Sequence, residues 1–155
     1  MNRPIIFESR IKEDVLFGTD VIVVLPVNLY RCNIGDDSFI GPFTEIQKKV
    51  SIGKRTKVQS HAFICELVTI GDDCFIGHGV MFINDLFSEG GPSRGDQSKW
   101  RSTLISNNVS IGSNATIMPV SICSHVVIGA GAVVTKDINR PGIYASNPAK
   151  KLRDL

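Results

Sequence analysis

The sequence carries an aliphatic residue at every sixth position over most of its length. The first run has twelve evenly spaced positions, ten of them Leu, Ile or Val: Leu16, Ile22, Asn28, Ile34, Ile40, Ile46, Ile52, Val58, Ile64, Ile70, Ile76 and Phe82. The spacing returns at Ile105, Ile111 and Ile117, and again at Ile122, Ile128 and Val134. An α-helix repeats every 3.6 residues and a half-buried strand every two, so neither explains a period of six. A fixed period of six predicts a parallel β-helix, in which short strands alternate with tight turns.

The residue types between these positions fit the same fold. If the aliphatic residue is position 1, position 2 is often glycine and position 5 is small or β-branched. Positions 1 and 5 are expected to face a narrow core, and the glycines with the Asp or Asn after them suit tight turns. Three hexads make one triangular coil, so residues eighteen apart stack, such as Leu16 on Ile34 and Ile22 on Ile40. Asn28 is the polar exception, and it marks either a frayed first coil or a polar interior residue.

Two interruptions break the six-residue spacing. Phe82 and Ile105 are 23 residues apart where six would continue the repeat, so 17 additional residues leave the coil. Between Ile117 and Ile122 one residue is missing, at 119–121. We therefore expect a single all-β domain over 1–155. Its parts are coils at about 14–82 and 105–134, a protruding loop at 83–104 and a short C-terminal tail at 135–155.

The composition argues against several classes of protein. The net charge of +2 is too small to indicate nucleic acid or an anionic membrane as a partner. No apolar run reaches membrane-spanning length, and the N-terminus lacks the apolar core of a signal peptide, which favours a cytoplasmic location. The four cysteines (Cys32, Cys65, Cys74 and Cys123) form no CxxC pair, so we expect reduced, structural thiols.

Two segments carry a resemblance to a known family. Residues 128–150, IGAGAVVTKDINRPGIYASNPAK, closely resemble the C-terminal signature of the left-handed β-helix (hexapeptide-repeat) acyltransferases. Residues 65–85, CELVTIGDDCFIGHGVMFIND, followed by the long loop, resemble the nucleotide-sugar N-acetyltransferases of surface-polysaccharide synthesis. The resemblance implies a left-handed coil, a homotrimer with active sites between subunits, acetyl-CoA as co-substrate and no metal. One departure is IMPVSI at 117–122, which lacks a glycine of the family pattern where the CoA-lining coils are expected.

The resemblance and the residue chemistry together select candidate site residues. His78 occupies an outward-facing turn position, and its ordinary pKa suits a base that accepts the proton of an attacking amine; the alternative is a solvated turn residue. The family likeness implies that Asn84 hydrogen-bonds the amine or a ring hydroxyl. It also implies that Asp85 binds the substrate by holding the amine or orients a histidine, and that Glu66 contacts the sugar of a neighbouring subunit's site. An Asx turn that starts the loop is the other interpretation of the Asn84–Asp85 pair. Trp100 either stacks on the substrate nucleotide or anchors the loop.

The late coils are the expected place for CoA. Small residues there let backbone groups approach the cofactor closely, namely Gly129, Ala130 and Gly131. Cations for the phosphates of CoA follow in the tail, at Lys136, Lys150 and Arg153. The sugar, its nucleotide, the position of the amine and the acyl length stay open.

Other functions known for this fold require residues that can be looked for in the sequence. A γ-type carbonic anhydrase needs three histidine ligands, two of them five residues apart. Here the fifth residue after each histidine is Glu66, Ile83 or Ala130, so the zinc site is not expected. An O-acetyltransferase for another small acceptor and a non-catalytic β-helix scaffold stay as alternatives. The GHGVMFIND block and the long loop favour an enzyme over a scaffold.

Overall fold

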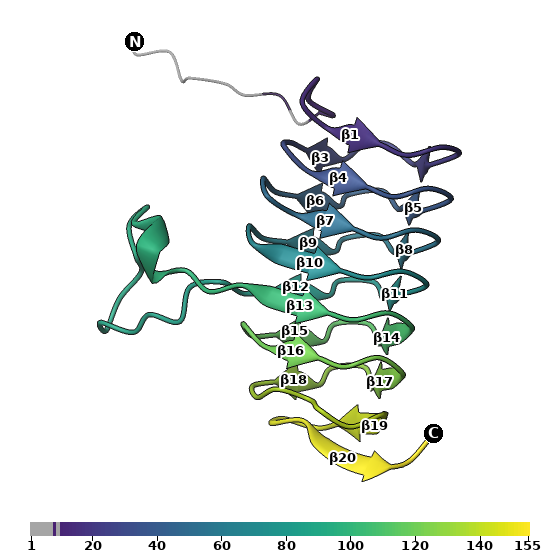
Figure 1. Cartoon of the computed structure of the whole chain (residues 1–155). Coiled ribbons are helices and arrows are strands. Elements are labelled where there is room, and N and C mark those ends of the chain that lie inside the picture. The colour runs from purple at the N-terminus through teal and green to yellow at the C-terminus, as the bar shows by residue number, and fades with distance from the viewer. Residues whose placement is uncertain (1–7, 9) are drawn as a thin grey trace.

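A computed structural model describes residue 8 and residues 10–155, so part of the N-terminal segment considered above lies outside the described residues. The described chain winds through about seven turns of a three-sided parallel β-helix (Figure 1). The predicted left-handed parallel β-helix is confirmed. Within the described residues, no helix is long and apolar enough to cross a membrane.

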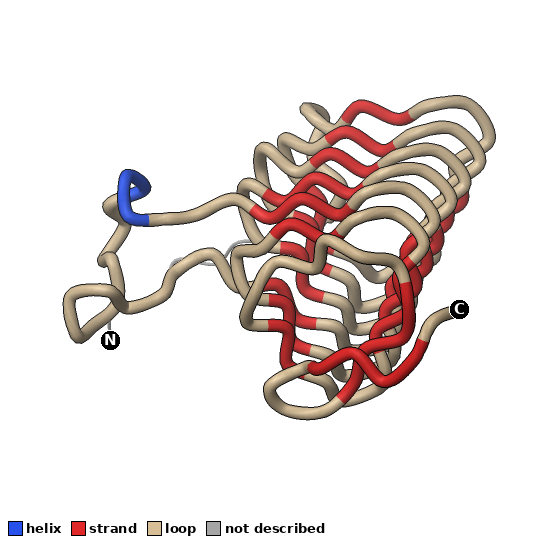
Figure 2. The backbone as a smooth tube through the Cα atoms, turned by 60° about the horizontal axis from the view of Figure 1, so that its bottom comes forward, coloured by secondary structure: helices blue, strands red, loops and turns tan. Residues whose placement is uncertain are grey.

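Each side of the prism is one sheet (Figure 2). Face 1 is formed by β1 (Leu16–Phe17), β4 (Asn33–Ile34), β7 (Ser51–Ile52), β10 (Val68–Ile70), β13 (Thr103–Ile105) and β16 (Ser121–Ile122). Face 2 is formed by β2 (Ile22–Val23), β5 (Phe39–Ile40), β8 (Lys57–Val58), β11 (Phe75–Ile76), β14 (Val109–Ile111), β17 (Val126–Ile128), β19 (Gly142–Ala145) and β20 (Lys150–Arg153). Face 3 is formed by β3 (Asn28–Leu29), β6 (Glu45–Ile46), β9 (Phe63–Ile64), β12 (Met81–Phe82), β15 (Thr116–Ile117) and β18 (Val133–Val134).

The core is the narrow interior of the prism. From the second coil onward, the predicted inward positions are buried, as Ile40, Ile64 and Ile111 show at position 1. Position 5 is buried as well, and Ala62 and Val80 illustrate the small or β-branched residues that it takes. Burying these stacked aliphatic side chains is the main favourable term for the fold, at about 25 cal/mol per Å² of apolar surface.

The predicted register of the first coil is wrong by one residue. Phe17 lies opposite Ile34, Val23 opposite Ile40 and Leu29 opposite Ile46. Leu16 and Ile22 therefore point outward, with 66% and 60% of their surface exposed. Successive side chains of a strand point to opposite sides, so a slip of one residue exchanges the inner and outer sets. Asn28 is thus neither a frayed end nor an interior residue, because Leu29 fills the core beside it.

Every irregularity of the coil falls on the corner where face 3 returns to face 1. The turn from Leu29 to Ile34 is one residue short, as is the turn from Ile117 to Ile122. The long loop leaves at the same corner, between β12 and β13 (Figure 1). Because β13 pairs directly with β10, with Ile105 opposite Ile70, the ladder continues beneath the loop. We call this the loop corner.

The C-terminal tail does not follow the six-residue spacing, but its strands belong to the sheet of face 2. The strand β19 pairs in parallel with β17, and β20 returns antiparallel to β19. These two strands close the C-terminal end of face 2.

Glycine occurs at position 2 because the backbones of adjacent coils pack too closely there for a side chain. A Cβ atom added to Gly35 would lie 2.7 Å from the backbone carbon of Gly53 in the next coil. The left-handed φ of the turn comes two residues later, at Asp37 (φ 56°). The role predicted for these glycines was turn flexibility, whereas their observed role is to let adjacent turns stack without a side chain between them.

Candidate functional site

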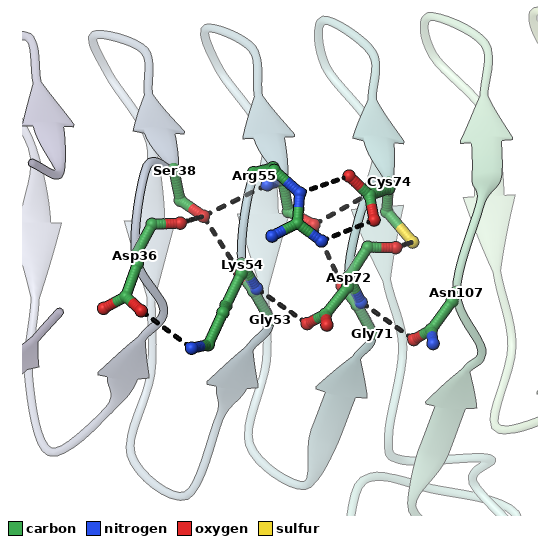
Figure 3. A network of polar contacts seen from close by, with 11 residues as sticks. Asp36, Ser38, Gly53, Lys54, Arg55, Gly71, Asp72, Cys74 and Asn107 are labelled. Carbon is green, nitrogen blue, oxygen red and sulfur yellow. Dashed lines mark hydrogen bonds and ion pairs between the residues drawn. The ribbon is translucent and has the colours of Figure 1, made fainter. Parts of the chain in front are cut away.

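The corner between faces 1 and 2 forms a ladder of paired polar side chains (Figure 3). Lys54 Nζ lies 2.8 Å from Asp36 Oδ2, and the Arg55 guanidinium holds both carboxylate oxygens of Asp73 at 2.7 Å. These hydrogen bonds lower the pKa values of Asp36 and Asp73. Asp72 Oδ1 accepts a hydrogen bond from the backbone N–H of Lys54 at 2.8 Å. We call this the ladder corner. Its charged side chains are paired with one another between adjacent coils, so they stabilise the coils and are not free to bind a ligand.

The corner between faces 2 and 3, called the histidine corner, carries His78. His78 is exposed in the turn between β11 and β12, and its Nδ1 atom lies 2.8 Å from the Oγ atom of Ser60, one coil below. His61 follows Ser60, and its ring stacks on Phe43 with centroids 4.9 Å apart. The third histidine, His125, lies on the ladder corner and is exposed. The outward orientation predicted for His78 agrees with its exposure.

The predicted CoA turn lies on the histidine corner, two coils beyond His78. Gly129, Ala130 and Gly131 join β17 to β18, and the last two are exposed. Gly131 has φ +68°, and a Cβ atom added there would meet nothing within 4 Å. We call residues 129–131 the bare turn. Since stacked strands lie about 4.8 Å apart, roughly 10 Å separates the bare turn from His78.

The three predicted phosphate-binding cations are not brought together. Lys150 in β20 lies opposite Ala145, and a Cβ atom added at Gly129 would lie 2.9 Å from the Ala145 Cβ atom, so Lys150 flanks the turn 129–131. Lys136 follows β18 on the loop corner instead. Arg153 lies further along β20, opposite Ile143, and its Nη1 atom donates to the carbonyl oxygen of Asp154. Of these cations, the structure groups Lys150 with the glycine-rich turn.

Glu66 and Asn84 meet on the loop corner. The Asn84 side-chain amide donates to the backbone oxygen of Glu66 at 3.3 Å. Glu66 is only 6% exposed, and its Oε1 atom lies 3.3 Å from Lys48 Nζ. Its Oε2 atom is buried and has no hydrogen-bond partner among the described residues. A buried carboxylate oxygen without a partner is energetically costly, which marks this corner as a candidate polar site.

The same corner contains polar residues that the sequence argument missed. The Tyr30 hydroxyl donates to Glu45 Oε1 at 3.3 Å, and burial together with Glu45 raises the pKa of Tyr30 to about 12. Gln47 Nε2 also donates to Glu45, at 3.0 Å. Lys48 was missed although it precedes Glu66 by eighteen residues, one full coil. The cavity along this corner has a volume of about 720 Å³ and is lined by Arg10, Lys12, Glu13, Asp14, Tyr30, Arg31, Lys48 and Glu66.

Asp85 and Trp100 organise the long loop. Asp85 Oδ1 accepts from the backbone N–H of Phe87 at 3.0 Å, and Oδ2 accepts from that of Ser93 at 2.7 Å. These two bonds lower the pKa of Asp85. The Trp100 indole N–H donates to Ser93 Oγ at 2.6 Å, so both predicted site residues converge on buried Ser93. Their proposed contacts with sugar and nucleotide stay predictions, and their observed contacts shape the loop.

His78 and Asn84 lie at opposite ends of β12, on different corners. Six residues of extended chain span at most about 20 Å, and a strand between two turns keeps its ends apart. One copy of the chain therefore presents two half-sites, with His78 and the bare turn on one corner and Asn84 and Glu66 on the other.

Comparison with known repeats assigns the family. The repeat described as bacterial transferase hexapeptide (six repeats) matches residues 31–66. The hexapeptide repeat of succinyl-transferase matches residues 67–81 and 103–136. The chain belongs to the hexapeptide-repeat transferases. The gap between the two segments of the second match falls on the protruding loop.

Known proteins agree with this family membership. Bifunctional protein GlmU of Heliobacterium modesticaldum is 28% identical over 96% of this chain and 32% of its own length, so the chain spans about a third of that relative. AntD, an N-acyltransferase from Bacillus cereus solved as a mutant with dTDP and coenzyme A, has a TM-score of 0.78 at 23% identity. That match covers 89% of this chain and 83% of AntD. The acetyltransferase VCA0836 of Vibrio cholerae O1 biovar eltor, solved with acetyl coenzyme A, has a TM-score of 0.66 at 27% identity, covering 79% and 70%. This hexapeptide-repeat transferase thus shares its fold with acyltransferases that were solved with coenzyme A or acetyl coenzyme A.

Proposed function

We propose that the protein transfers the acetyl group of acetyl-CoA to the amine of a nucleotide-linked amino sugar. The observation that carries this proposal is the arrangement on the histidine corner. An exposed histidine, held at one ring nitrogen by Ser60, lies roughly 10 Å from the bare turn Gly129–Gly131. The structures of AntD with dTDP and coenzyme A and of VCA0836 with acetyl coenzyme A support the choice of acetyl-CoA as donor and of a nucleotide-linked acceptor.

The proposed reaction needs few protein groups. The neutral amine attacks the thioester carbonyl, so a C–N bond forms and the C–S bond breaks. His78 accepts the proton released by the amine and returns it to the departing CoA sulfur. A free amine is a good nucleophile, so holding the two substrates together supplies much of the rate. Residues 129–131 and Lys150 hold CoA in this scheme.

The acceptor half-site is the loop corner. Asn84, whose Nδ2 atom donates to the backbone of Glu66, offers its Oδ1 atom to the amine or to a ring hydroxyl of the sugar. Glu66 and Asp85 belong to the same corner. A homotrimer with sites between subunits would place the loop corner of one subunit against the histidine corner of the next. This assembly, a cytoplasmic location and a role in surface-polysaccharide synthesis belong to the proposal. No step in the scheme needs a metal.

The direct test is a panel of nucleotide-linked amino sugars, carrying UDP or dTDP, assayed with acetyl-CoA for release of free thiol. We expect thiol release with at least one amino acceptor and none with the matching sugar that has a hydroxyl in place of the amine. Thiol release with the hydroxyl sugars instead would favour an O-acetyltransferase. Absence of CoA binding by calorimetry would favour a scaffold.

A further inference from the structure

The histidine corner carries an exposed aromatic stack that has no part in the proposed reaction. Phe43 is 58% exposed and stacks on His61. Both residues occupy the left-handed turn position, with φ of 60° and 63°. Most other coils have a small polar or long charged residue at this position, as at Asp37, Lys49, Arg55, Asp73, Asn108 and Asn114, and Leu67 and His125 are the other bulky residues there. A bulky ring in this conformation carries a conformational cost, and at Phe43 burial does not offset that cost.

A hollow opens beside the Phe43 ring. It has a volume of about 360 Å³ and is lined by Pro26, Val27, Asn28, Phe43, Thr44 and Glu45. Its floor is apolar, from Pro26 and Val27. Its polar edge comes from Asn28 and Glu45, which lie opposite each other on the paired strands β3 and β6. An aromatic face beside an amide edge suits a ligand that is flat, aromatic and able to form hydrogen bonds along its rim.

A chain of contacts connects Phe43, at the edge of the hollow, with the proposed catalytic histidine. Phe43 stacks on His61, His61 follows Ser60, and Ser60 is bonded to His78. The hollow lies two to three coils from His78, about 10–15 Å at 4.8 Å per coil. In a nucleotide-linked sugar, the ribose and the diphosphate separate the base from the hexose that bears the amine. A base in the hollow therefore leaves the hexose free to extend toward His78.

We infer that the Phe43 ring and the hollow beside it bind the nucleobase of the acceptor. This inference rests on the proposed function. It assigns the base of the acceptor to the histidine corner and leaves the amino sugar between His78 and the loop corner of the next subunit. Stacking fixes the plane of the base against Phe43, and the side-chain amide of Asn28 pairs with its edge. Phe43 is a binding residue in this scheme and takes no part in the chemistry.

The test begins with binding and does not depend on turnover. Calorimetric titrations with UDP and with dTDP would compare the wild-type protein with Phe43→Ala, Phe43→Tyr and Phe75→Ala. Phe75 is the matched control because it is 42% exposed but lies on the outer side of face 2. We expect Phe43→Ala to weaken binding of the preferred nucleotide roughly 10-fold to 100-fold, which lies within the range for loss of a base-stacking ring. Phe43→Tyr should restore binding, and Phe75→Ala should match the wild type.

Kinetics then separate the base from the sugar. With the nucleotide-linked acceptor, Phe43→Ala should raise the KM of the acceptor while leaving kcat and the KM of acetyl-CoA unchanged. With the amino sugar 1-phosphate, which lacks a base, the wild type and Phe43→Ala should have the same KM. An equal loss with both acceptors would show that the ring holds the sugar, which overturns the inference. It is also overturned if the wild type binds neither nucleotide, or if Phe43→Ala binds as tightly as the wild type. Nucleotide binding without acetyl transfer to any acceptor would contradict the proposed function alone.

Discussion

The Nδ1 atom of His78 lies 2.8 Å from the Oγ atom of Ser60, one coil below it. A neutral imidazole has one protonated nitrogen and one nitrogen with a free lone pair. The hydrogen-bond partner of Nδ1 determines which of the two nitrogens carries the proton. When Nδ1–H donates to Ser60, the lone pair is on Nε2 and the ring can accept a proton there. Ser60 is therefore a positioning residue for the proposed base.

Replacing His78 tests how far the reaction depends on a base. We expect His78→Ala to lower kcat about 100-fold with an amine acceptor, at the lower end of the range for general base catalysis, and to leave measurable activity. The remaining rate comes from positioning of the substrates. His125→Ala is the control, because His125 is also an exposed turn histidine but lies on the ladder corner. Complete loss of activity in a folded His78→Ala protein would argue against a mechanism dominated by positioning.

The stacked turns predict where a single methyl group is not tolerated. In Gly35→Ala the new Cβ atom would lie 2.7 Å from the Gly53 backbone, so one of the two coils must shift. We expect a loss of about 2–3 kcal/mol in the free energy of unfolding and a fall in Tm of roughly 4–12 °C. Gly91→Ala should stay within about 0.5 kcal/mol, since a Cβ atom there meets nothing within 4 Å. Equal Tm values for the two variants, measured by circular dichroism, would contradict this account of position 2.

Lys48 is expected to stabilise the protein chiefly by pairing a buried charge. Lys48→Met would leave the Glu66 carboxylate buried without its cation, which should cost about 3 kcal/mol in urea denaturation. Adding Glu66→Gln to that variant removes the charge and should recover part of the loss. If the double variant is less stable than Lys48→Met, the buried charge is not the source of the destabilisation.

The sequence predicted the fold because a period of six admits few other structures. It misplaced the first coil because adjacent apolar residues, Leu16 with Phe17 and Ile22 with Val23, allow either register. The pairing that decides the register is made with the next coil, through Phe17 and Ile34. The hydrophobicity of these strands alone leaves the register open, and the available signal for the observed register was Gly18, which stands at position 2 after Phe17.

The candidate site was only partly predictable for a related reason. The spacing of eighteen residues indicates which side chains share a column, and it could have joined Lys48 to Glu66 and Asn84. His78 and Asn84 are only six residues apart in the sequence, which suggested a shared site. In the structure they lie on two different corners of the prism, at opposite ends of β12. The loop contacts of Asp85 could not be predicted from the repeat. An irregular loop has no period from which to infer that Asp85 and Trp100 both contact Ser93.

The Asp85 contacts predict an acid-induced loosening of the loop. The folded pKa of Asp85 is lowered below the ordinary value of 3.8 by the backbone N–H groups of Ser93 and Phe87. A lowered folded pKa means that the anchoring is complete above pH 3.8 and is lost as the pH falls through the folded value. Trp100, the single tryptophan, reports this change, since its indole donates to Ser93. We expect its fluorescence emission to move to longer wavelength below about pH 4.

Variants assign this acid transition to one carboxyl group. Asp85→Asn should show the longer-wavelength emission already at pH 7 and no further shift on acidification. Asp96→Asn, in the same loop, should keep most of the transition, although the pKa of Asp96 is lowered by Ser98. Asp154→Asn, at the far end of the chain, should behave as the wild type. Constant emission of the wild type from pH 7 to about pH 2 would show that Asp85 does not hold the loop around Trp100.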